Sequence, residues 1–264
     1  MSSPAFQHSP DDLHGCVALV TGASSGIGEA TARALAARGA SVSLVARRQD
    51  ELEALAADLN GQGQQAGVVA ADVTEQVQAE RAVQQTVERW GRLDIVVNSA
   101  GLTLFESADN PLEAHLEDWN KMVALNISGL LYIVHAALPH LLSAAETSSR
   151  RVSDLVNVSS VSGRRPQAGA SVYGMTKAGV ISFSEALRQS VAKRHLRVGV
   201  IEPGTTDTEM KSHQRPEVQQ QIEKRLAGLE LLRAADVADA VLYMVTRPRR
   251  AAVSELTVRP TEQA

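Results

Sequence analysis

The sequence predicts a single α/β domain built around a doubly wound, seven-stranded parallel sheet. Short apolar or β-branched runs alternate with longer segments that carry apolar residues at three- and four-residue spacing, which is typical of strands and their covering helices. Several of the short runs are apolar through most of their length, as expected when helices cover both faces of a sheet. The 264 residues contain no internal repeat or low-complexity linker, which favours one domain.

The predicted elements alternate regularly along the chain. Strands are predicted at Val17–Val20, Ser41–Ala46, Gly67–Ala71, Leu93–Val97, Asp154–Val158, Arg197–Ile201 and Glu255–Val258. Helices that pack on the sheet are predicted at Gly26–Arg38, Gln49–Asn60, Glu75–Trp90, Glu117–Ser143, Tyr173–Arg194 and Ala235–Thr246. The binding crevice of such a fold is expected at the carboxyl ends of the strands.

Two segments depart from this alternation. Residues 1–14 are polar, with neither a basic start nor an apolar stretch, so we expect a flexible N-terminal leader before a packed domain over residues 15–264. Residues 205–230 are polar and weakly periodic, with Pro216 in the middle, and predict a loop with one or two short helices. Their place after the sixth strand favours a substrate lid over the crevice, with a plain surface excursion as the alternative.

The bulk composition excludes several classes of partner. With 44% hydrophobic residues and a net charge of -4, the chain has no field that would attract nucleic acid. No apolar run approaches the roughly 20 residues needed to cross a bilayer, so no membrane partner is expected. Cys16 is the single cysteine and gives no sign of an oxidising compartment, which favours a cytoplasmic location. The seven histidines show no metal-ligand spacing.

A glycine-rich turn follows the first predicted strand and leads directly into a helix. Glycines allow a sharp turn and a close approach to a pyrophosphate, while the helix supplies free N–H groups and the positive end of its dipole. Such turns are common wherever a strand meets a helix, but this context predicts a dinucleotide-binding site of the Rossmann type. The expected cofactor contacts are Gly22, Ser24, Ser25, Gly26, Ile27 and Gly28.

The second predicted strand ends in Ala46-Arg47-Arg48. A fold that prefers NAD usually places an acidic residue there, against the adenosine ribose hydroxyls. Two arginines instead offer planar, permanently charged donors that suit a 2′-phosphate. The sequence therefore favours NADP(H), with a solvated helix start as the alternative interpretation of the arginines.

Tyr173 and Lys177 lie four residues apart in a predicted helix, which places both side chains on one face. A phenol ordinarily titrates near pH 10, so it is a poor proton donor or acceptor at neutral pH unless a cation stabilises its phenolate. Lys177 can supply that cation. Taken alone, the pair is a weak motif, because ordinary surface helices contain many such pairs.

Several motifs together resemble the short-chain dehydrogenase/reductase family, in the family's order and spacing from about residue 15 to the C-terminus. They are Thr21–Gly28, Asn98-Ser99-Ala100-Gly101, Asn126, Ser159-Ser160, Tyr173 with Lys177, and Pro203-Gly204. The resemblance implies an oxidoreductase that reduces a carbonyl group or oxidises the matching alcohol. It also implies a dimer or, more often, a tetramer.

The resemblance assigns a four-residue catalytic site. Tyr173 is expected to give a proton to the substrate oxygen, and Ser160, thirteen positions earlier, to hydrogen-bond that oxygen, whereas Ser159 does not fit the spacing. Lys177 is expected to hold the nicotinamide ribose and to lower the pKa of the tyrosine. Asn126 is expected to hold a water that links the lysine to solvent.

The resemblance also implies further cofactor contacts besides Tyr173 and Lys177. These are Asp72, Val73, Asn98, Ala100, Gly101, Pro203, Gly204, Thr206 and Thr208. The motif Asn-Ser-Ala-Gly replaces the usual Asn-Asn-Ala-Gly, and the glycine turn lacks the basic residue of many NADP-dependent relatives. The preference for NADP therefore depends on Arg47 and Arg48.

The substrate stays open at this stage. Residues 202–209 and 258–263 resemble a branch of the family that reduces an aldehyde in antibiotic metabolism. Arg164 and Arg165 follow Ser160 closely enough to meet an anionic substrate at the mouth of the pocket, although a solvated loop is the simpler interpretation. The alternatives are a ketoreductase of carrier-bound β-ketoacyl chains and, from another class, a protein that senses NADP without turnover.

Overall fold

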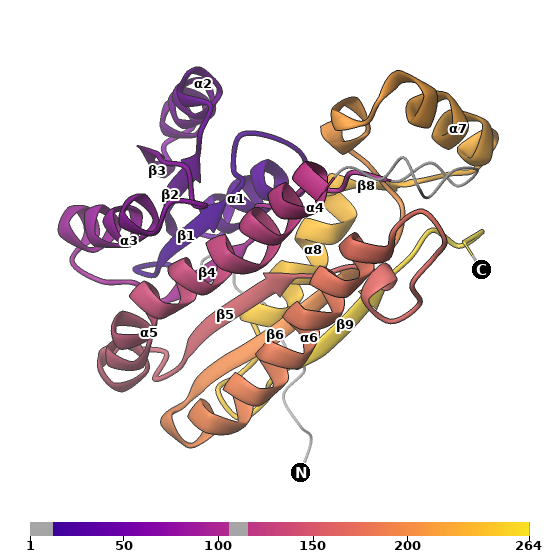
Figure 1. Ribbon diagram of the computed structural model, residues 1–264. Coiled ribbons are helices and arrows are strands. Elements are labelled where there is room, and N and C mark those ends of the chain that lie inside the picture. Colours follow the sequence, from indigo (N-terminus) through magenta and orange to yellow (C-terminus); the bar gives the residue numbers. More distant parts are fainter. Residues whose placement is uncertain (1–12, 106–115, 264) are drawn as a thin grey trace, which may run out of the picture.

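The computed structural model describes residues 13–105 and 116–263. Its centre is a seven-stranded, all-parallel sheet in the order β3-β2-β1-β4-β5-β6-β9 (Figure 1). All seven predicted strands are present, and so the predicted fold class is confirmed. The strands are β1 Val17–Thr21, β2 Ser41–Ala46, β3 Gln65–Ala70, β4 Ile95–Asn98, β5 Ser153–Val158, β6 Leu196–Pro203 and β9 Glu255–Val258.

The strand order reverses at β1, which pairs with β2 on one side and with β4 on the other. Connections therefore leave β1 and β4 toward opposite faces, and a crevice opens where their carboxyl ends diverge. Thr21 is the last residue of β1, and its Oγ1 accepts hydrogen bonds of 3.1 Å from the backbone N–H groups of Ser99 and Ala100. These two bonds join the loops that border the crevice.

Helices cover both faces of the sheet and form two separate cores. Successive residues of β1 alternate between them: Ala18 and Val20 pack with α1, α2 and α8, whereas Val17 and Leu19 pack with α3, α5 and α6. Burial on both faces is the reason that the central strands β1 and β4 are almost entirely apolar. The helices are α1 Gly26–Ala37, α2 Gln49–Gly61, α3 Gln76–Trp90, α4 Leu116–Val123, α5 Leu130–Thr147, α6 Ser171–Val191 and α8 Ala234–Val245.

The helix predicted over residues 117–143 differs from the expectation. It consists of α4, a π-helical turn η2 at Ala124–Gly129, and α5, which continues past Pro139 to Thr147. A Cβ at Gly129 would lie 3.0 Å from the carbonyl oxygen of Val73, so glycine allows the turn to approach the loop after β3. Residues 116–147 are long and apolar enough to cross a membrane by length and composition. This is weak evidence, because α5 also supplies core residues of a globular fold.

The segment after β6 has the short helices that the sequence predicts. A 3-10 helix, η5, spans Glu209–His213, and α7 spans Pro216–Leu226 with the proline in its first turn, where no N–H is needed. Strands β7 Thr206–Asp207 and β8 Leu232–Arg233 pair at the base of the segment. Figure 1 shows α7 standing beyond the carboxyl ends of the large sheet. Two more 3-10 turns, η3 Val161–Gly163 and η4 Ala192–Arg194, flank α6.

The predicted leader, residues 1–14, is too long by at least two residues. Leu13 is fully buried, and its backbone N–H donates to the carbonyl of Arg38. The packed domain therefore includes Leu13 and not only residues from 15 onward. Residues 1–12 of the predicted leader lie outside the described part of the chain.

A buried ionic cluster joins β5 to β6 at the edge opposite the crevice. Both carboxylate oxygens of Asp154 accept from Arg197, at 2.7 and 2.9 Å, and one accepts from Arg150 at 3.1 Å. Arg197 also donates to the carbonyls of Val245, Arg247 and Ala251. The arginine thus fixes the loop between α8 and β9 to the sheet.

Replacing Asp154 with Ala should destabilise the fold strongly. The side chains of Arg197 and Asp154 are only 8% and 3% exposed, and so the change leaves a buried guanidinium without its counter-charge, at a cost of about 3–5 kcal/mol. Urea denaturation of the two proteins measures this loss. The control is Glu146→Ala, which removes the exposed partner of Arg194 and should cost less than about 1 kcal/mol. Equal losses in the two variants would contradict the prediction.

Candidate active site

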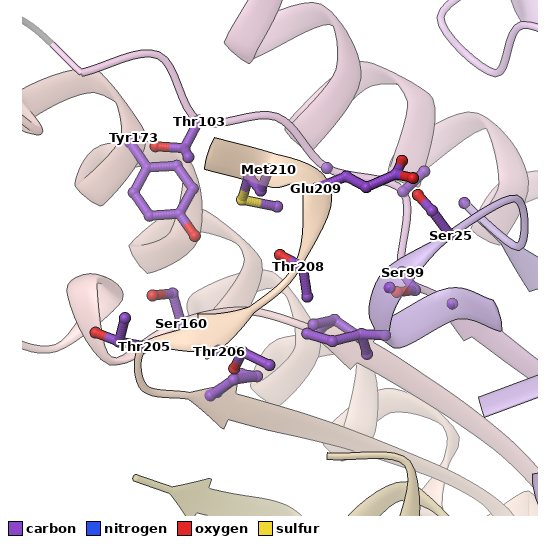
Figure 2. A pocket seen from close by; sticks show the side chains of 18 of the residues that line it. Ser25, Ser99, Thr103, Ser160, Tyr173, Thr205, Thr206, Thr208, Glu209 and Met210 are labelled. Atoms are coloured by element: carbon purple, nitrogen blue, oxygen red, sulfur yellow. The ribbon is translucent and has the colours of Figure 1, made fainter. Parts of the chain in front are cut away.

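A cleft of about 590 Å³ lies at the carboxyl ends of the strands, where the order of the sheet reverses. Figure 2 shows part of it, with Ser160 and Tyr173 on one side and Ser25 on the other. Most of the residues predicted to bind the cofactor line it: Gly22, Ser24, Ser25, Gly26, Ile27, Gly28, Ala46, Arg47, Arg48, Asp72, Val73, Ala100, Gly101, Tyr173, Lys177, Pro203, Gly204, Thr206 and Thr208. The sequence motifs, which span almost 190 residues, therefore converge on one site.

The glycine turn between β1 and α1 depends on close backbone contacts. Gly22 has a φ of 68°, and a Cβ there would lie 2.9 Å from the backbone of Ala100. A Cβ at Gly28 would overlap the carbonyl of Gly22. Helix α1 begins directly after Ser25, and so its first N–H groups, which have no partner within a helix, are available to an anion at this end of the cleft.

The two arginines after β2 lie beside this turn. The Arg48 Nη2 donates to the hydroxyls of Ser24 and Ser25 at 3.0 and 2.7 Å, and Nη1 forms an ion pair of 3.0 Å with Glu209. Arg47 is more open: its side chain is 73% exposed, and Nη1 lies 3.8 Å from the carboxylate of Asp72. Both guanidinium groups border the cleft at the end nearest the glycine turn.

Ser160 and Tyr173 face each other across the other end of the cleft (Figure 2). Ser160 ends the loop after β5 and caps η3, where its Oγ accepts from the N–H of Ser162 at 3.1 Å. Tyr173 is in the first turn of α6 and is buried. Burial raises the pKa of the Tyr173 phenol, and a hydrogen bond with Ser160 partly counteracts that rise. The phenol is therefore protonated at neutral pH.

Lys177 lies one helical turn after Tyr173 and is 5% exposed. Its Nζ donates to the carbonyl of Val158 at 2.8 Å and stands 5.8 Å from the centre of the Tyr173 ring. Burial lowers the pKa of Lys177 to about 8, so the ammonium stays mostly charged at pH 7. Ser159 has a structural contact instead: its hydroxyl donates to the Lys177 carbonyl at 2.8 Å.

Asn126 is in the π-helical turn and is buried behind the cleft. Its Oδ1 accepts from the N–H of Leu102 and its Nδ2 donates to the carbonyl of the same residue, both at 2.8 Å. Nδ2 also donates to Thr176 Oγ1 at 3.1 Å, and that hydroxyl donates to the carbonyl of Tyr173 at 2.8 Å. Asn126 thus ties the loop after β4 to the helix that carries Tyr173 and Lys177.

Asn98 also lies behind the cleft and is not among the residues that line it. It is 3% exposed, and its Nδ2 donates to Asn157 Oδ1 at 2.9 Å. We expected Asn98 to contact the cofactor as part of the cleft floor. It instead joins the ends of β4 and β5, while Ala100 and Gly101 form the floor.

Residues that the sequence analysis did not single out shape the end of the cleft next to Tyr173. The Phe105 ring meets the Tyr173 ring edge-on, at 6.3 Å between centroids. Buried Gln214 donates to the Thr103 carbonyl and accepts from the Phe105 N–H at 2.6 and 2.9 Å. Further apolar side chains that line the cleft are Met210, Ile222, Leu226, Leu229 and Leu231. In the sequence, only the three- and four-residue spacing of Ile222, Leu226 and Leu229 indicated an apolar face in this segment.

We expected Arg164 and Arg165 to lie at the mouth of the cleft, where they could meet an anionic substrate. Arg164 does not line it, because its guanidinium forms ion pairs with Glu202 at 3.0 Å and Glu255 at 2.6 Å. Arg165 is exposed and is also absent from the lining. The C-terminal tail, in contrast, does reach the cleft: Gln263 Oε1 accepts from the N–H of Thr205 at 2.9 Å.

Comparisons with known proteins agree with this geometry. The sequence profile of the short chain dehydrogenase family matches residues 16–219. The chain belongs to that family. It is therefore an oxidoreductase that acts on CH–OH groups or the corresponding carbonyls. Within residues 13–105 and 116–263, no three His, Cys, Asp or Glu side chains gather as metal ligands.

An uncharacterized oxidoreductase of Staphylococcus epidermidis is 36% identical over 92% of this chain and 96% of its own length. Among solved structures, the closed form of a serine dehydrogenase complexed with NADP+ has a TM-score of 0.84 at 32% identity, covering 94% of this chain and 96% of its own. A 3-ketoacyl-(acyl-carrier-protein) reductase from Brucella melitensis, complexed with NADH, has a TM-score of 0.83 at 26% identity, covering 96% of this chain and all of its own.

Replacing Lys177 with Met should stabilise the fold at pH 7 while removing activity. The lowered pKa means that the folded state binds the lysine proton less tightly than the unfolded state does, so the charged form costs stability below about pH 8. Relief of that cost is worth about 1–3 kcal/mol, and it should shrink as the pH rises toward 10.5, where both states lose the proton. Thermal unfolding at pH 7 and at pH 10 tests both statements.

The matched control is Lys193→Met, on an exposed lysine, which should change stability little at either pH. Destabilisation by Lys177→Met at pH 7 would mean that the bond to the Val158 carbonyl outweighs the cost of burial.

Proposed function

We propose that the protein is an NADP(H)-dependent reductase that converts the carbonyl group of a small aldehyde or ketone to the alcohol, reversibly. The observation that carries the proposal is the placement of Ser160, Tyr173 and Lys177 in the same cleft as the glycine turn and Arg48. An acid–base group thus lies within one cavity with a dinucleotide site.

The residues present fit NADP(H) along the whole cleft. The start of α1 suits the pyrophosphate, Asp72 and Val73 border the place of the adenine, and Arg47 with Arg48 suits a 2′-phosphate. Thr205 and Thr206 lie near Ser160 on the nicotinamide side, whereas Thr208 lies toward the glycine turn. The NADP+ in the related serine dehydrogenase supports the same choice of cofactor. When bound, the reduced cofactor supplies the hydride for the carbonyl carbon.

The protein's own groups handle the proton. Tyr173 donates it to the carbonyl oxygen, for which the raised pKa keeps the phenol protonated. Ser160, already hydrogen-bonded to the phenol, holds that oxygen in place. The Lys177 ammonium stabilises the phenolate that remains and binds the nicotinamide ribose. Asn126 joins the loop after β4 to α6 through its hydrogen bonds. We also assign to Asn126 the binding of a water molecule that returns a proton to the site through Lys177.

The substrate is an uncharged, largely apolar carbonyl compound. Phe105 meets the Tyr173 ring edge-on, and Met210, Ile222 and Leu226 also line the cleft. Arg164 is paired elsewhere. Transfer of a carboxylate into such surroundings would be costly without a cationic partner. Because residues 205–230 provide much of this lining, we assign them the role of a lid.

One more specific form of this function and two alternatives to it are distinguished by the following features. The segments at residues 202–209 and 258–263 resemble clavulanic acid dehydrogenase, which favours an aldehyde in specialised or antibiotic metabolism. The structural likeness to a 3-ketoacyl-(acyl-carrier-protein) reductase favours a carrier-bound β-ketoacyl chain instead. A protein that senses NADP without turnover would not need Ser160, Tyr173 and Lys177 together.

We further propose a cytoplasmic homo-oligomer, either a dimer or a tetramer. Helices α5 and α6 expose Leu131 and Met175, at 38% and 57%, on the sides away from the sheet. Such apolar side chains on two long helices suit contact with a second subunit. The single cysteine, Cys16, is buried, which fits a protein of a reducing compartment.

Replacing Tyr173 with Phe should lower kcat for aldehyde reduction by about 10²- to 10⁴-fold, because the variant lacks the proton donor. Binding of NADPH, followed by its fluorescence, should change less than about twofold. Tyr243→Phe is the control, since that tyrosine is 49% exposed and should leave kcat unchanged. If Tyr173→Phe retained full turnover, or if the native protein bound NADPH without oxidising it on any carbonyl, the reductase assignment would be wrong.

A negative charge on the substrate should lower kcat/KM. Hexanal should give a kcat/KM at least about tenfold higher than 6-oxohexanoate, because the second compound brings a carboxylate into the apolar end of the cleft. Initial rates with NADPH for the pair measure this ratio. A ratio of one or less would remove the apolar assignment, and comparable rates on acetoacetyl thioesters would favour the ketoreductase.

A further inference from the structure

The beginning of the lid lies directly over the glycine turn. A Cβ at Gly26 would be 3.2 Å from the methyl carbon of Thr208, and the next residue, Glu209, places a carboxylate oxygen 3.0 Å from Arg48 Nη1. Arg48 and Glu209 are 161 positions apart, and both line the cleft. An ion pair therefore joins the lid to the N-cap residue of α2, and both of its partners line the cleft.

The remaining donors of Arg48 are also engaged. Nε and Nη2 donate to Ser24 Oγ at 3.2 and 3.0 Å, and Nη2 donates to Ser25 Oγ at 2.7 Å. A second carboxylate, that of Glu51 in α2, lies 3.8 Å from Nη1. Glu209 and Glu51 thus neutralise the guanidinium that we assign to the 2′-phosphate, and Glu209 is the one of the two that belongs to the lid.

A 2′-phosphate that binds Arg48 brings up to two negative charges next to Glu209. Like charges at such a distance repel, and a phosphate competes directly for the planar N–H donors of arginine. A cofactor without the 2′-phosphate brings no such charge and leaves the ion pair intact. The response of the lid should therefore depend on which cofactor enters.

We infer that Glu209 is a residue that determines cofactor specificity: its carboxylate forms an ion pair with Arg48, and the 2′-phosphate of NADP(H) displaces it and frees the start of the lid. The inference rests on the proposed role of Arg48. It deepens the proposed function, because it couples the choice of NADP(H) over NAD(H) to the segment that covers the substrate.

The affinity test uses the adenosine half of the cofactor, so that it needs no turnover. Calorimetry gives Kd values for adenosine 2′,5′-bisphosphate and for 5′-AMP, which lacks the 2′-phosphate. Glu209→Gln should tighten the bisphosphate by about threefold to tenfold and change 5′-AMP by less than about twofold, and the gain should shrink at 0.5 M salt. Glu223→Gln, on an exposed residue of α7 that does not line the cleft, should change neither Kd.

The lid test uses hydrogen exchange of residues 206–213. In the native protein the bisphosphate should speed exchange in this segment, whereas 5′-AMP should not. Glu209→Gln should exchange fast without any ligand. Glu51→Gln removes a similar charge from α2 and should leave exchange of the segment as in the native protein.

Arg48→Ala separates the inference from the assignment on which it rests. If this variant binds the bisphosphate as tightly as the native protein does, Arg48 does not bind the 2′-phosphate. Both that assignment and the role of Glu209 are then wrong. If Arg48→Ala weakens the bisphosphate while Glu209→Gln leaves it unchanged or weakens it, only the role of Glu209 is overturned. An equal effect of both ligands on lid exchange would overturn the coupling in the same way.

Discussion

The close approach of the glycine turn to the loop after β4 is the constraint on which the site depends. Gly22 packs against the backbone of Ala100 with no room for a side chain, and Thr21 Oγ1 holds the N–H groups of Ser99 and Ala100. These contacts close the bottom of the crevice between β1 and β4. They set the distance from the start of α1, where an anion can bind, to Gly101 and the Lys177 side chain behind it.

Buried polar side chains fix the part of the cleft that contains Tyr173 and Lys177. Both Lys177 and Asn126 lie next to Gly101, since a Cβ there would lie 3.4 Å from Lys177 Nζ and 3.5 Å from Asn126 Oδ1. Asn126 and Thr176 connect the loop after β4 to the backbone of Tyr173. A π-helical turn, often found at functional sites, gives Asn126 this position. These contacts fix the positions of Tyr173 and Lys177 within the fold. They also bury the charge of Lys177, which lowers the free energy of unfolding.

Local patterns were enough for the elements and for most of the motifs. Apolar runs fixed the strands because helices bury both faces of a parallel sheet, and the turn from Thr21 to Gly28 had a strand before it and a helix after it. Patterns of this kind did not show that η2 interrupts the helix predicted over 117–143, at the place where Gly129 approaches the loop after β3. Nor did they show that Asn98 bonds to Asn157 and lies outside the cleft.

By itself, the sequence determined the sheet, its helices, the phosphate turn and the chemical pair of Tyr173 and Lys177, because each depends on neighbours within a few residues. The tertiary structure alone decided which distant groups meet. It paired Arg164 with Glu202 and Glu255, away from the lining of the cleft. It also paired Glu209 with Arg48. The physical reason is that charge pairing and apolar lining depend on contacts between segments far apart in the chain, which no local spacing records.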